Sequence, residues 1–321
     1  MSVRIAVLDD YQHAASTMAD WSGPLPGTDV TFFDRAITDQ AELIATLTPF
    51  QVIVAMRERT AFPRSVLEKL PELKLLVTTA GSNAAIDLVA GGELGVTVTG
   101  TRAHPPGTAE LTWALILNLF RDVAGDDARI RAGQWQTTVA GDLDGEILGV
   151  VGLGRLGARV ARIGAAFGMD VVAWSPNLTA ERAAEHGARL VTKADLFATA
   201  KVVTVHMMLS DRSRGLIGAA ELGAMREDAY LVNTSRSPII DAEALRTALT
   251  TATGPAKVAL DVFDTEPLPA DHWLRSSPRT LLTPHMGYVT EKTYRIFYGD
   301  AVEDIAAFLA DPTTPLRPLV P

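Results

Sequence analysis

A glycine-rich turn near the middle of the chain limits the possible folds more than any other feature of the sequence. It follows an apolar run at residues 147–151 and precedes a helix-like segment at residues 158–167. The turn consists of Gly152, Leu153, Gly154, Arg155, Leu156 and Gly157. Glycines at this spacing permit a tight turn and a close approach of the backbone to a pyrophosphate, whose charge the helix N-terminus favours. The pattern predicts dinucleotide binding, with a plain strand-to-helix turn as the alternative.

Short β-rich runs alternate with helical stretches on both sides of this turn, which indicates α/β units with mostly parallel sheets. In the first hundred residues we expect helices at 40–47, 65–70 and 84–90, and strands at 4–8, 30–33, 51–55, 73–78 and 96–99. The same order restarts at residue 146, with strands expected at 147–152, 170–174, 202–206, 230–233, 257–262 and 280–283. The chain therefore contains a second α/β unit, and the glycine turn makes this unit a doubly wound Rossmann-type domain.

The join between the two units is expected at residues 101–107, where His104-Pro105-Pro106-Gly107 precedes an apolar helix. A further helix at 300–309 and the tail after it are expected to return to the first unit. We predict one unit formed by residues 1–100 and 290–321, and a dinucleotide-binding domain formed by residues 101–289.

Composition narrows the class of partner. The formal net charge is -9, which argues against binding to a nucleic-acid backbone. The chain has no cysteine, which excludes disulfides and thiolate chemistry and is compatible with a reducing cytoplasm. The apolar run at 111–120 is about half of the ~20 residues that a membrane span requires, and no secretory signal is recognisable. We expect a cytoplasmic protein that binds a small molecule, without a metal, nucleic-acid or membrane site.

The residues after the strand at 170–174 bear on the choice of cofactor. An acidic residue at this point normally binds the ribose hydroxyls of NAD, but here Ser175, Pro176 and Asn177 follow the strand. Ser175, Asn177 and Thr179 can donate hydrogen bonds to a 2'-phosphate, whereas the only nearby cation is Arg182. The sequence therefore leaves NAD and NADP as equal alternatives.

Three polar groups follow later strands of the second unit. Arg236 comes after the strand at 230–233, Glu266 after the strand at 257–262, and His285 after the strand at 280–283. Ligands of open parallel sheets bind beyond the carboxyl ends of the strands, so neighbouring strands would bring these residues to one edge. Singly, each has a plain alternative: a solvated arginine, an acid that shapes a turn, and a capping or buried histidine. Their combination beside a dinucleotide turn is what hydride transfer to a 2-oxo acid requires.

The chemistry assigns a role to each group. The planar guanidinium of Arg236 matches a substrate carboxylate and polarises the neighbouring carbonyl. The carbonyl oxygen gains charge as hydride arrives and needs a proton, which His285 is expected to supply. Glu266, bonded to the other ring nitrogen, would orient the imidazole and favour its protonated form.

With these motifs in this order, the chain resembles the D-isomer-specific 2-hydroxyacid dehydrogenases over residues 96–287. The resemblance rests on the glycine turn, the run Val205-His206-Met207-Met208-Leu209, the stretch from residue 231 to Arg236 with Asp241, the segment 261–267, and Thr283-Pro284-His285. It implies that Arg236, Glu266 and His285 are the catalytic trio of an NAD(P)-dependent enzyme acting on a small 2-hydroxy or 2-oxo acid. It also implies a split, flavodoxin-like substrate domain and a homodimer. The cofactor residues that it implies are Arg155, Leu156, His206, Thr234, Ser235, Asp261 and Gly287, with Asp261 near the nicotinamide.

The sequence departs from the family pattern on the substrate side. The loop containing Ser82 and Asn83 resembles the substrate-cradling loop, but it lacks the usual paired glycines. Tyr288 replaces the second glycine after the histidine and is expected to project into the site and narrow it. Arg57 offers a second cation for an acidic substrate, with a solvated arginine as the alternative.

Two other functions remain open from the sequence. Similar folds serve as dinucleotide-sensing corepressors, in which the cofactor controls association rather than turnover. A formate dehydrogenase is the other alternative, although that chemistry usually pairs the histidine with Gln, and this chain has Glu266.

Overall fold

The structure is a computed structural model that describes residues 2–104, 106–251 and 253–319. It divides into two compact units. Unit 1 comprises Met1–His104 with Val289–Pro321, and unit 2 comprises Pro105–Tyr288. Pro105, which belongs to the expected join, lies outside the described residues. No helix among the described residues is long and apolar enough to cross a membrane.

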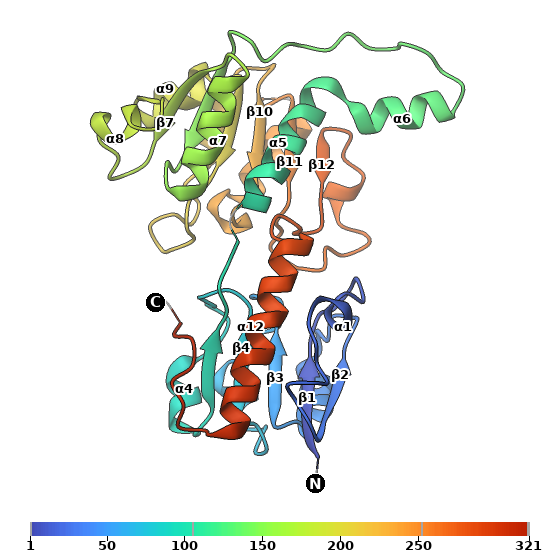
Figure 1. The fold of residues 1–321 in the computed structure, drawn as a ribbon. Helices are drawn as coiled ribbons and strands as arrows, with labels where there is room; N and C mark the ends of the chain where they lie inside the picture. Colours follow the sequence, from blue (N-terminus) through green and yellow to red (C-terminus); the bar gives the residue numbers. More distant parts are fainter. Residues whose placement is uncertain (1, 105, 252, 320–321) are drawn as a thin grey trace. The chain divides into compact units, whose positions relative to one another are not determined.

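Unit 1 is built on a parallel five-stranded sheet with the order β2-β1-β3-β4-β5 (Figure 1). Its strands are β1 (Val3–Val7), β2 (Thr28–Phe32), β3 (Val52–Ala55), β4 (Leu75–Thr78) and β5 (Thr97–Gly100). Its helices are α1 (Ala15–Met18), α2 (Gln40–Leu47), α3 (Arg64–Leu67), α4 (Leu88–Glu93) and α12 (Glu291–Ala310). Side chains of β1, β3, β4 and helices α2 to α4 form one apolar core, while α12 packs on β4 and on α1. The flavodoxin-like strand order is thus as the sequence resemblance implied.

Unit 2 is built on a seven-stranded parallel sheet with the order β12-β11-β10-β9-β6-β7-β8. Its strands are β6 (Ile147–Val151), β7 (Asp170–Trp174), β8 (Arg189–Leu190), β9 (Val202–Val205), β10 (Tyr230–Asn233), β11 (Lys257–Leu260) and β12 (Thr280–Leu282). Its α-helices are α5 (Pro106–Arg121), α6 (Val123–Arg131), α7 (Arg155–Ala166), α8 (Ala180–Ala184), α9 (Lys193–Thr199), α10 (Ala219–Ala224) and α11 (Ala242–Thr251), with 3-10 turns η1 (Ser237–Ile239) and η2 (Trp273–Arg275).

Both faces of this sheet are buried, which explains why its strands are almost entirely apolar. Val150 packs into a core shared with α5 and α7, whereas the next residue, Val151, packs into a core shared with α9, α10 and α11. The expected α/β class and Rossmann-type unit are confirmed. The sequence missed β8, which has only two residues, and placed the start of α12 too late.

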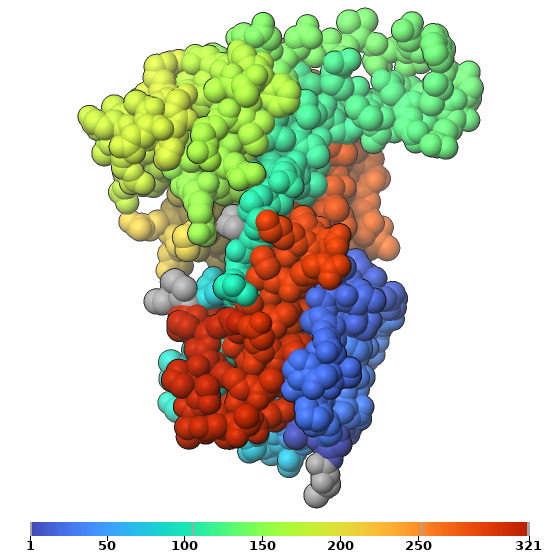
Figure 2. All heavy atoms as spheres, viewed as in Figure 1, coloured from blue at the N-terminus to red at the C-terminus, as the bar shows by residue number. Residues whose placement is uncertain are grey.

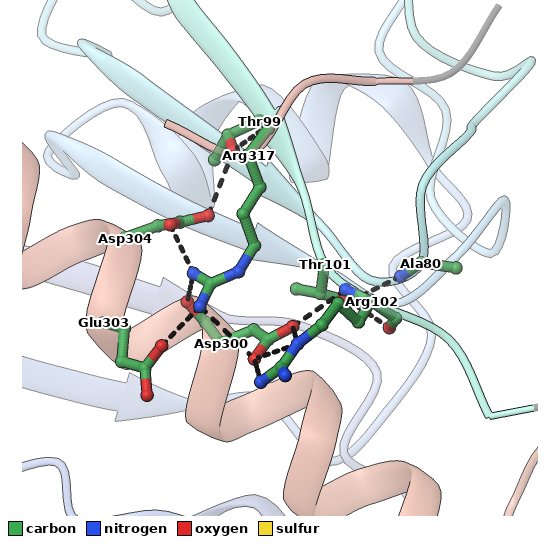
Figure 3. A network of polar contacts seen from close by, with 8 residues as sticks. All are labelled: Ala80, Thr99, Thr101, Arg102, Asp300, Glu303, Asp304 and Arg317. Atoms are coloured by element: carbon green, nitrogen blue, oxygen red, sulfur yellow. Dashed lines mark hydrogen bonds and ion pairs between the residues drawn. The ribbon is translucent and has the colours of Figure 1, made fainter. Parts of the chain in front are cut away.

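A buried acidic pair on α12 ties the C-terminal segment to β5 (Figure 3). The side chains of Asp300 and Asp304 are only 1% and 6% exposed. Arg102 donates from Nη2 to Asp300 Oδ1 at 2.6 Å, and Arg317 forms ion pairs with both carboxylates. Thr99 Oγ1 donates to the carbonyl of Arg317 at 2.7 Å. Burial raises the pKa of Asp304, and the charge of Arg317 opposes that effect.

Replacing Arg317 with Met should lower the free energy of unfolding by about 3 kcal/mol, because Asp304 would remain buried without its cation. Urea-induced unfolding of the two proteins at pH 7 measures this loss. Arg295→Met is the matched control, because Arg295 pairs with Glu291 on the surface of the same helix. Equal losses from both substitutions would show that the burial of Asp300 and Asp304 does not increase the contribution of Arg317 to the free energy of unfolding.

Candidate active site

The glycine turn joins β6 to α7 and packs against the backbone that follows β9. Gly152 has a φ of +96°, and a Cβ atom built on it would lie 2.6 Å from the carbonyl oxygen of His206. A Cβ on Gly157 would lie 2.1 Å from the carbonyl oxygen of Gly152. Only glycine fits at these two positions. Gly154, in contrast, caps α7 with open space around it, so the N–H groups at the start of α7 can be approached by a pyrophosphate.

Ser175, Pro176 and Asn177 follow β7, as the sequence indicated, and no carboxylate stands among them. Thr179 caps α8, and its hydroxyl oxygen accepts a hydrogen bond from the backbone N–H of Arg182. Because a hydroxyl that accepts a hydrogen bond can still donate one, Ser175, Asn177 and Thr179 remain the donors for the adenosine ribose or a phosphate on it.

His206 follows β9, and its backbone N–H donates to the carbonyl of Val151 on β6. Its ring Nε2 lies 2.9 Å from Thr204 Oγ1, whereas the buried Nδ1 has no hydrogen-bond partner. Burial lowers the pKa of His206 to about 3, so the ring is neutral at pH 7. An orphaned buried nitrogen beside the glycine turn is the kind of group that a bound ligand would satisfy.

The loop after β10 carries Thr234, Ser235 and Arg236. Ser235 Oγ donates to the carbonyl of Val205 at 2.9 Å, and Thr234 Oγ1 lies 2.9 Å from Thr112 Oγ1 on α5. The Asn233 side chain donates to the carbonyl of Arg236 at 3.0 Å. These bonds fix the backbone on either side of Arg236. The Arg236 guanidinium itself donates to the carbonyl of Ser235 at 2.8 Å.

Asp261, directly after β11, organises the loop that carries His285. Its buried carboxylate accepts hydrogen bonds from Thr283 Oγ1 at 2.7 Å and from the backbone N–H groups of Met286 and Gly287 at 2.8 and 2.9 Å. Burial raises the pKa of Asp261, and these hydrogen bonds oppose that effect. The resemblance placed Asp261 near the cofactor. The sequence did not show that Asp261 also holds the loop that carries His285 in place.

Glu266 and His285 are in direct contact. Glu266 Oε2 lies 2.6 Å from His285 Nδ1, while Oε1 accepts a hydrogen bond from the backbone N–H of Phe263 at 2.9 Å. The side chains are 27% and 17% exposed, so the pair is reachable but partly withdrawn from water. Because Nδ1 is engaged, Nε2 is the nitrogen through which the ring can exchange a proton with a ligand. His285 has a φ of +51°, a strained value of the kind that is common at functional sites.

The sheet order explains how these groups gather. The strands β10, β11 and β12 are parallel neighbours, so Arg236, Glu266 and His285 follow adjacent strands at one edge. The turn after β6 lies at the same edge, with β9 between β6 and β10. The expectation that the trio follows parallel neighbours is correct, and the structure joins Glu266 to His285 directly.

In unit 1, the predicted substrate residues lie after β3 and β4. Arg57 has a φ of +54°, and its backbone N–H donates to Thr79 Oγ1 at 2.9 Å. The buried Asn83 amide donates to the carbonyl of Arg57 at 2.6 Å and to Thr78 Oγ1 at 2.8 Å. Asn83 therefore positions Arg57, whereas Ser82 is exposed.

Sequence reasoning missed a neighbouring pair in this unit. The guanidinium of Arg59 stacks 4.6 Å from the ring centre of Tyr11 and donates to the carbonyl of Asp9 at 3.1 Å. These residues follow β1 and β3, adjacent strands at the switch point of the sheet, so the rule of searching strand ends could have found them. Within the described ranges, no group of His, Asp and Glu has an arrangement that could hold a metal ion.

Comparison with known proteins links this site to one family. The model of the D-isomer specific 2-hydroxyacid dehydrogenase NAD-binding domain matches residues 113–287. A glyoxylate reductase from Aeropyrum pernix is 37% identical over 257 residues, which cover 76% of this chain and 75% of that protein. A D-3-phosphoglycerate dehydrogenase from Bacillus subtilis is 32% identical over 256 residues, 79% of this chain but only 48% of that protein. The chain thus spans about half the length of this second relative.

Comparison with solved structures leads to the same family. The crystal structure of a phosphoglycerate oxidoreductase from Vibrio cholerae O395 matches with a TM-score of 0.91 at 35% identity, covering 96% of this chain and 99% of that one.

The buried His206 should make stability fall with acidification. Between its unfolded pKa of 6.5 and its folded pKa of about 3, the unfolded chain binds a proton that the folded chain does not. The free energy of unfolding should therefore fall by up to about 1.4 kcal/mol per pH unit in this window. His206→Gln should lack this component, which urea unfolding at pH 7, 6 and 5 measures. His13→Gln, at an exposed histidine, is the control and should retain the wild-type slope.

Proposed function

Because the chain belongs to the D-isomer-specific 2-hydroxyacid dehydrogenase family, an NAD(P)-dependent group of oxidoreductases acting on CH–OH groups, we propose that it interconverts a small 2-oxo acid and its D-2-hydroxy acid. The single observation that carries this proposal is the Glu266–His285 hydrogen bond of 2.6 Å at the strand edge that also holds the glycine turn.

The residues around the glycine turn fit a nicotinamide dinucleotide. The open space around Gly154 leaves the start of α7 accessible to the pyrophosphate, with Arg155 and Leu156 in its first turn. The orphaned Nδ1 of His206 supplies a polar contact beside the turn. When bound, the cofactor supplies or accepts the hydride. Thr234, Ser235, Asp261 and Gly287 complete the proposed cofactor set, and Ser175 and Asn177 leave both NAD and NADP open.

His285 is the proposed acid and base. In reduction, Nε2 gives its proton to the carbonyl oxygen of the substrate as negative charge develops there; in oxidation it removes the hydroxyl proton. Glu266 accepts the hydrogen bond from Nδ1, which holds the tautomer and compensates the positive charge of the imidazolium. Its second oxygen is held by the Phe263 N–H, so the carboxylate itself is fixed.

Arg236 is the proposed anchor for the substrate carboxylate. Its guanidinium can bind a carboxylate through two parallel hydrogen bonds, and its backbone is held by Asn233. Arg57 is proposed as a second cation for an acidic substrate, held in its strained conformation by Thr79 and Asn83. Ser82 is proposed as a further substrate residue, whereas Tyr288, expected from the sequence to project into the site, lies against the His285 ring. Glyoxylate and phosphoglycerate, the substrates in the relatives' names, are candidates of the right class.

A panel of 2-oxo acids assayed with NADH and with NADPH tests the function. Steady turnover of at least one acid is expected, and His285→Gln should lower kcat by about a hundredfold or more, because it removes the proton donor. Arg236→Lys should lower kcat/KM, because a point charge cannot replace a bidentate fork. His186→Gln, in the same unit but outside the site, is the matched control.

The outcomes separate the alternatives. Tight binding of the cofactor without turnover of any 2-oxo acid would identify a dinucleotide-sensing corepressor instead. Oxidation of formate with NAD+ or NADP+ as the hydride acceptor, without turnover of any 2-oxo acid, would identify a formate dehydrogenase. Near-normal kcat in His285→Gln would remove this residue from proton transfer.

We also propose that the protein is cytoplasmic, which its lack of cysteine fits. We further propose that it forms a homodimer, and that α6 and the segment after it form the contact between the two copies. They stand out as an arm at the edge of unit 2 (Figures 1 and 2). The helix buries none of its residues, and Ile130, Trp135 and Val139 are 53%, 74% and 101% exposed. Large exposed apolar side chains on a projecting segment favour an interaction surface there.

A second copy fits this arm because the surface carries both signs of charge. A groove of about 620 Å³ between α5 and α6 is lined by Leu117, Arg121, Val123, Asp126, Asp127 and Ile130. A two-fold contact places each patch against its own copy, so apolar residues and opposite charges can meet.

Replacing Ile130, Trp135 and Val139 together with Ser should convert a dimer into a monomer, which sedimentation equilibrium measures. Val89→Ser, at an exposed apolar residue outside the arm, should leave the mass unchanged. A monomeric wild-type protein, or a dimer that survives the triple substitution, would contradict the proposed contact.

A further inference from the structure

The aromatic ring of Tyr288 lies against the imidazole of His285. The two ring centres are 5.6 Å apart, and the ring planes meet at 76°. Perpendicular arrangements at this separation are favourable contacts between aromatic rings. The imidazole is thus held by two neighbours of different kinds: the Glu266 carboxylate at Nδ1 and the ring of Tyr288.

The path of the chain between the two rings is fixed by buried groups. Asp261 accepts hydrogen bonds from the N–H groups of Met286 and Gly287, the two residues between His285 and Tyr288. A Cβ built on Gly287 would lie 3.1 Å from Thr108 Cγ2 and 3.2 Å from Asp261 Oδ2, so a larger residue would push this turn outward. The backbone therefore delivers Tyr288 to the imidazole in one defined position.

A single hydrogen bond does not orient a histidine ring fully. The contact at Nδ1 limits the movement of that atom, but rotation about both side-chain torsions of His285 together can still tilt the ring while the hydrogen bond is kept, and the last torsion of a histidine side chain has broad energy wells. Proton transfer through Nε2 requires this nitrogen to point at the substrate oxygen. A ring standing at 76° to the imidazole restricts that rotation.

We propose that Tyr288 is a positioning residue that orients the His285 imidazole for proton transfer. This inference rests on the proposed function of His285 and deepens it. The family pattern that the chain resembles has a glycine at this position, so the resemblance does not assign the role. The aromatic ring matters for the contact, and the hydroxyl group is not required.

Two substitutions and one control test the role. Tyr288→Phe retains the ring, and Tyr288→Leu removes it while keeping an apolar side chain. Tyr230→Leu is the matched control, because Tyr230 also forms a perpendicular ring pair in unit 2, with Phe120 at 5.1 Å and 81°, but at the opposite, amino end of the sheet. Steady-state kinetics and proton NMR are measured for all three, with His285→Gln used to assign the Nδ1 proton.

Tyr288→Leu should lower kcat by about tenfold or more with KM nearly unchanged, because a misdirected Nε2 slows the chemical step. Its Nδ1 proton, shared with Glu266 and expected far downfield, should broaden through faster exchange with water. Tyr288→Phe and Tyr230→Leu should retain both the wild-type kcat and the sharp signal.

The proposal is overturned if the signal stays sharp and kcat stays unchanged in Tyr288→Leu, or if KM rises while kcat holds, which would make Tyr288 a substrate contact. It is also overturned if Tyr288→Phe behaves like Tyr288→Leu. The NMR signal needs no substrate, so this test remains decisive if the wild-type protein turns over no 2-oxo acid. In that case a broadened signal in Tyr288→Leu would support the role of Tyr288 in holding the His285 ring, while the proposed function would be contradicted.

Discussion

Parallel pairing of the strands in unit 2 is the constraint on which the rest of the site depends. Because β6, β9, β10, β11 and β12 run in one direction as successive partners, the residue after each strand lies at the same edge of the sheet. The strands are covered on both faces and are apolar, so polar groups can collect only in the loops beyond them. The glycine turn, His206, Arg236, Asp261 and His285 all occupy such positions.

Buried polar side chains hold these loops in place. Asp261 binds the backbone on the far side of His285, Ser235 joins the ends of β9 and β10, and Asn83 fixes the strained backbone of Arg57 in unit 1. Each satisfies its hydrogen-bonding capacity within the protein, which is the condition for burying a polar group at little cost. The more exposed groups, Arg57, Glu266 and His285, are thereby directed by residues that do not themselves need to reach a substrate.

The chain shares the main site motifs of its family but departs from the family pattern after β7 and at Tyr288. The Glu266–His285 pair and the glycine turn agree with the dehydrogenase chemistry of the family to which the chain belongs. The absence of an acid after β7 affects only the adenosine end of the cofactor site. The aromatic ring of Tyr288 affects the orientation of the His285 imidazole. Neither difference removes the glycine turn or the Glu266–His285 pair.

Apart from the two-residue β8, the sequence by itself determined the strands, the glycine turn and the candidates Arg236, Glu266 and His285, because apolar runs, glycines and strand-end polar residues are local signals. It determined α2 to the residue, but it missed the first half of α12, where aromatic residues and Gly299 are weak helix formers until Tyr294 and Phe297 are buried. The chemistry of the site predicted a bond between Glu266 and His285, which the fold makes across 19 positions. Only the tertiary structure decided that Asp261 binds groups 22 to 26 residues away. These contacts depend on which strands are neighbours, and that order is set by packing between distant segments.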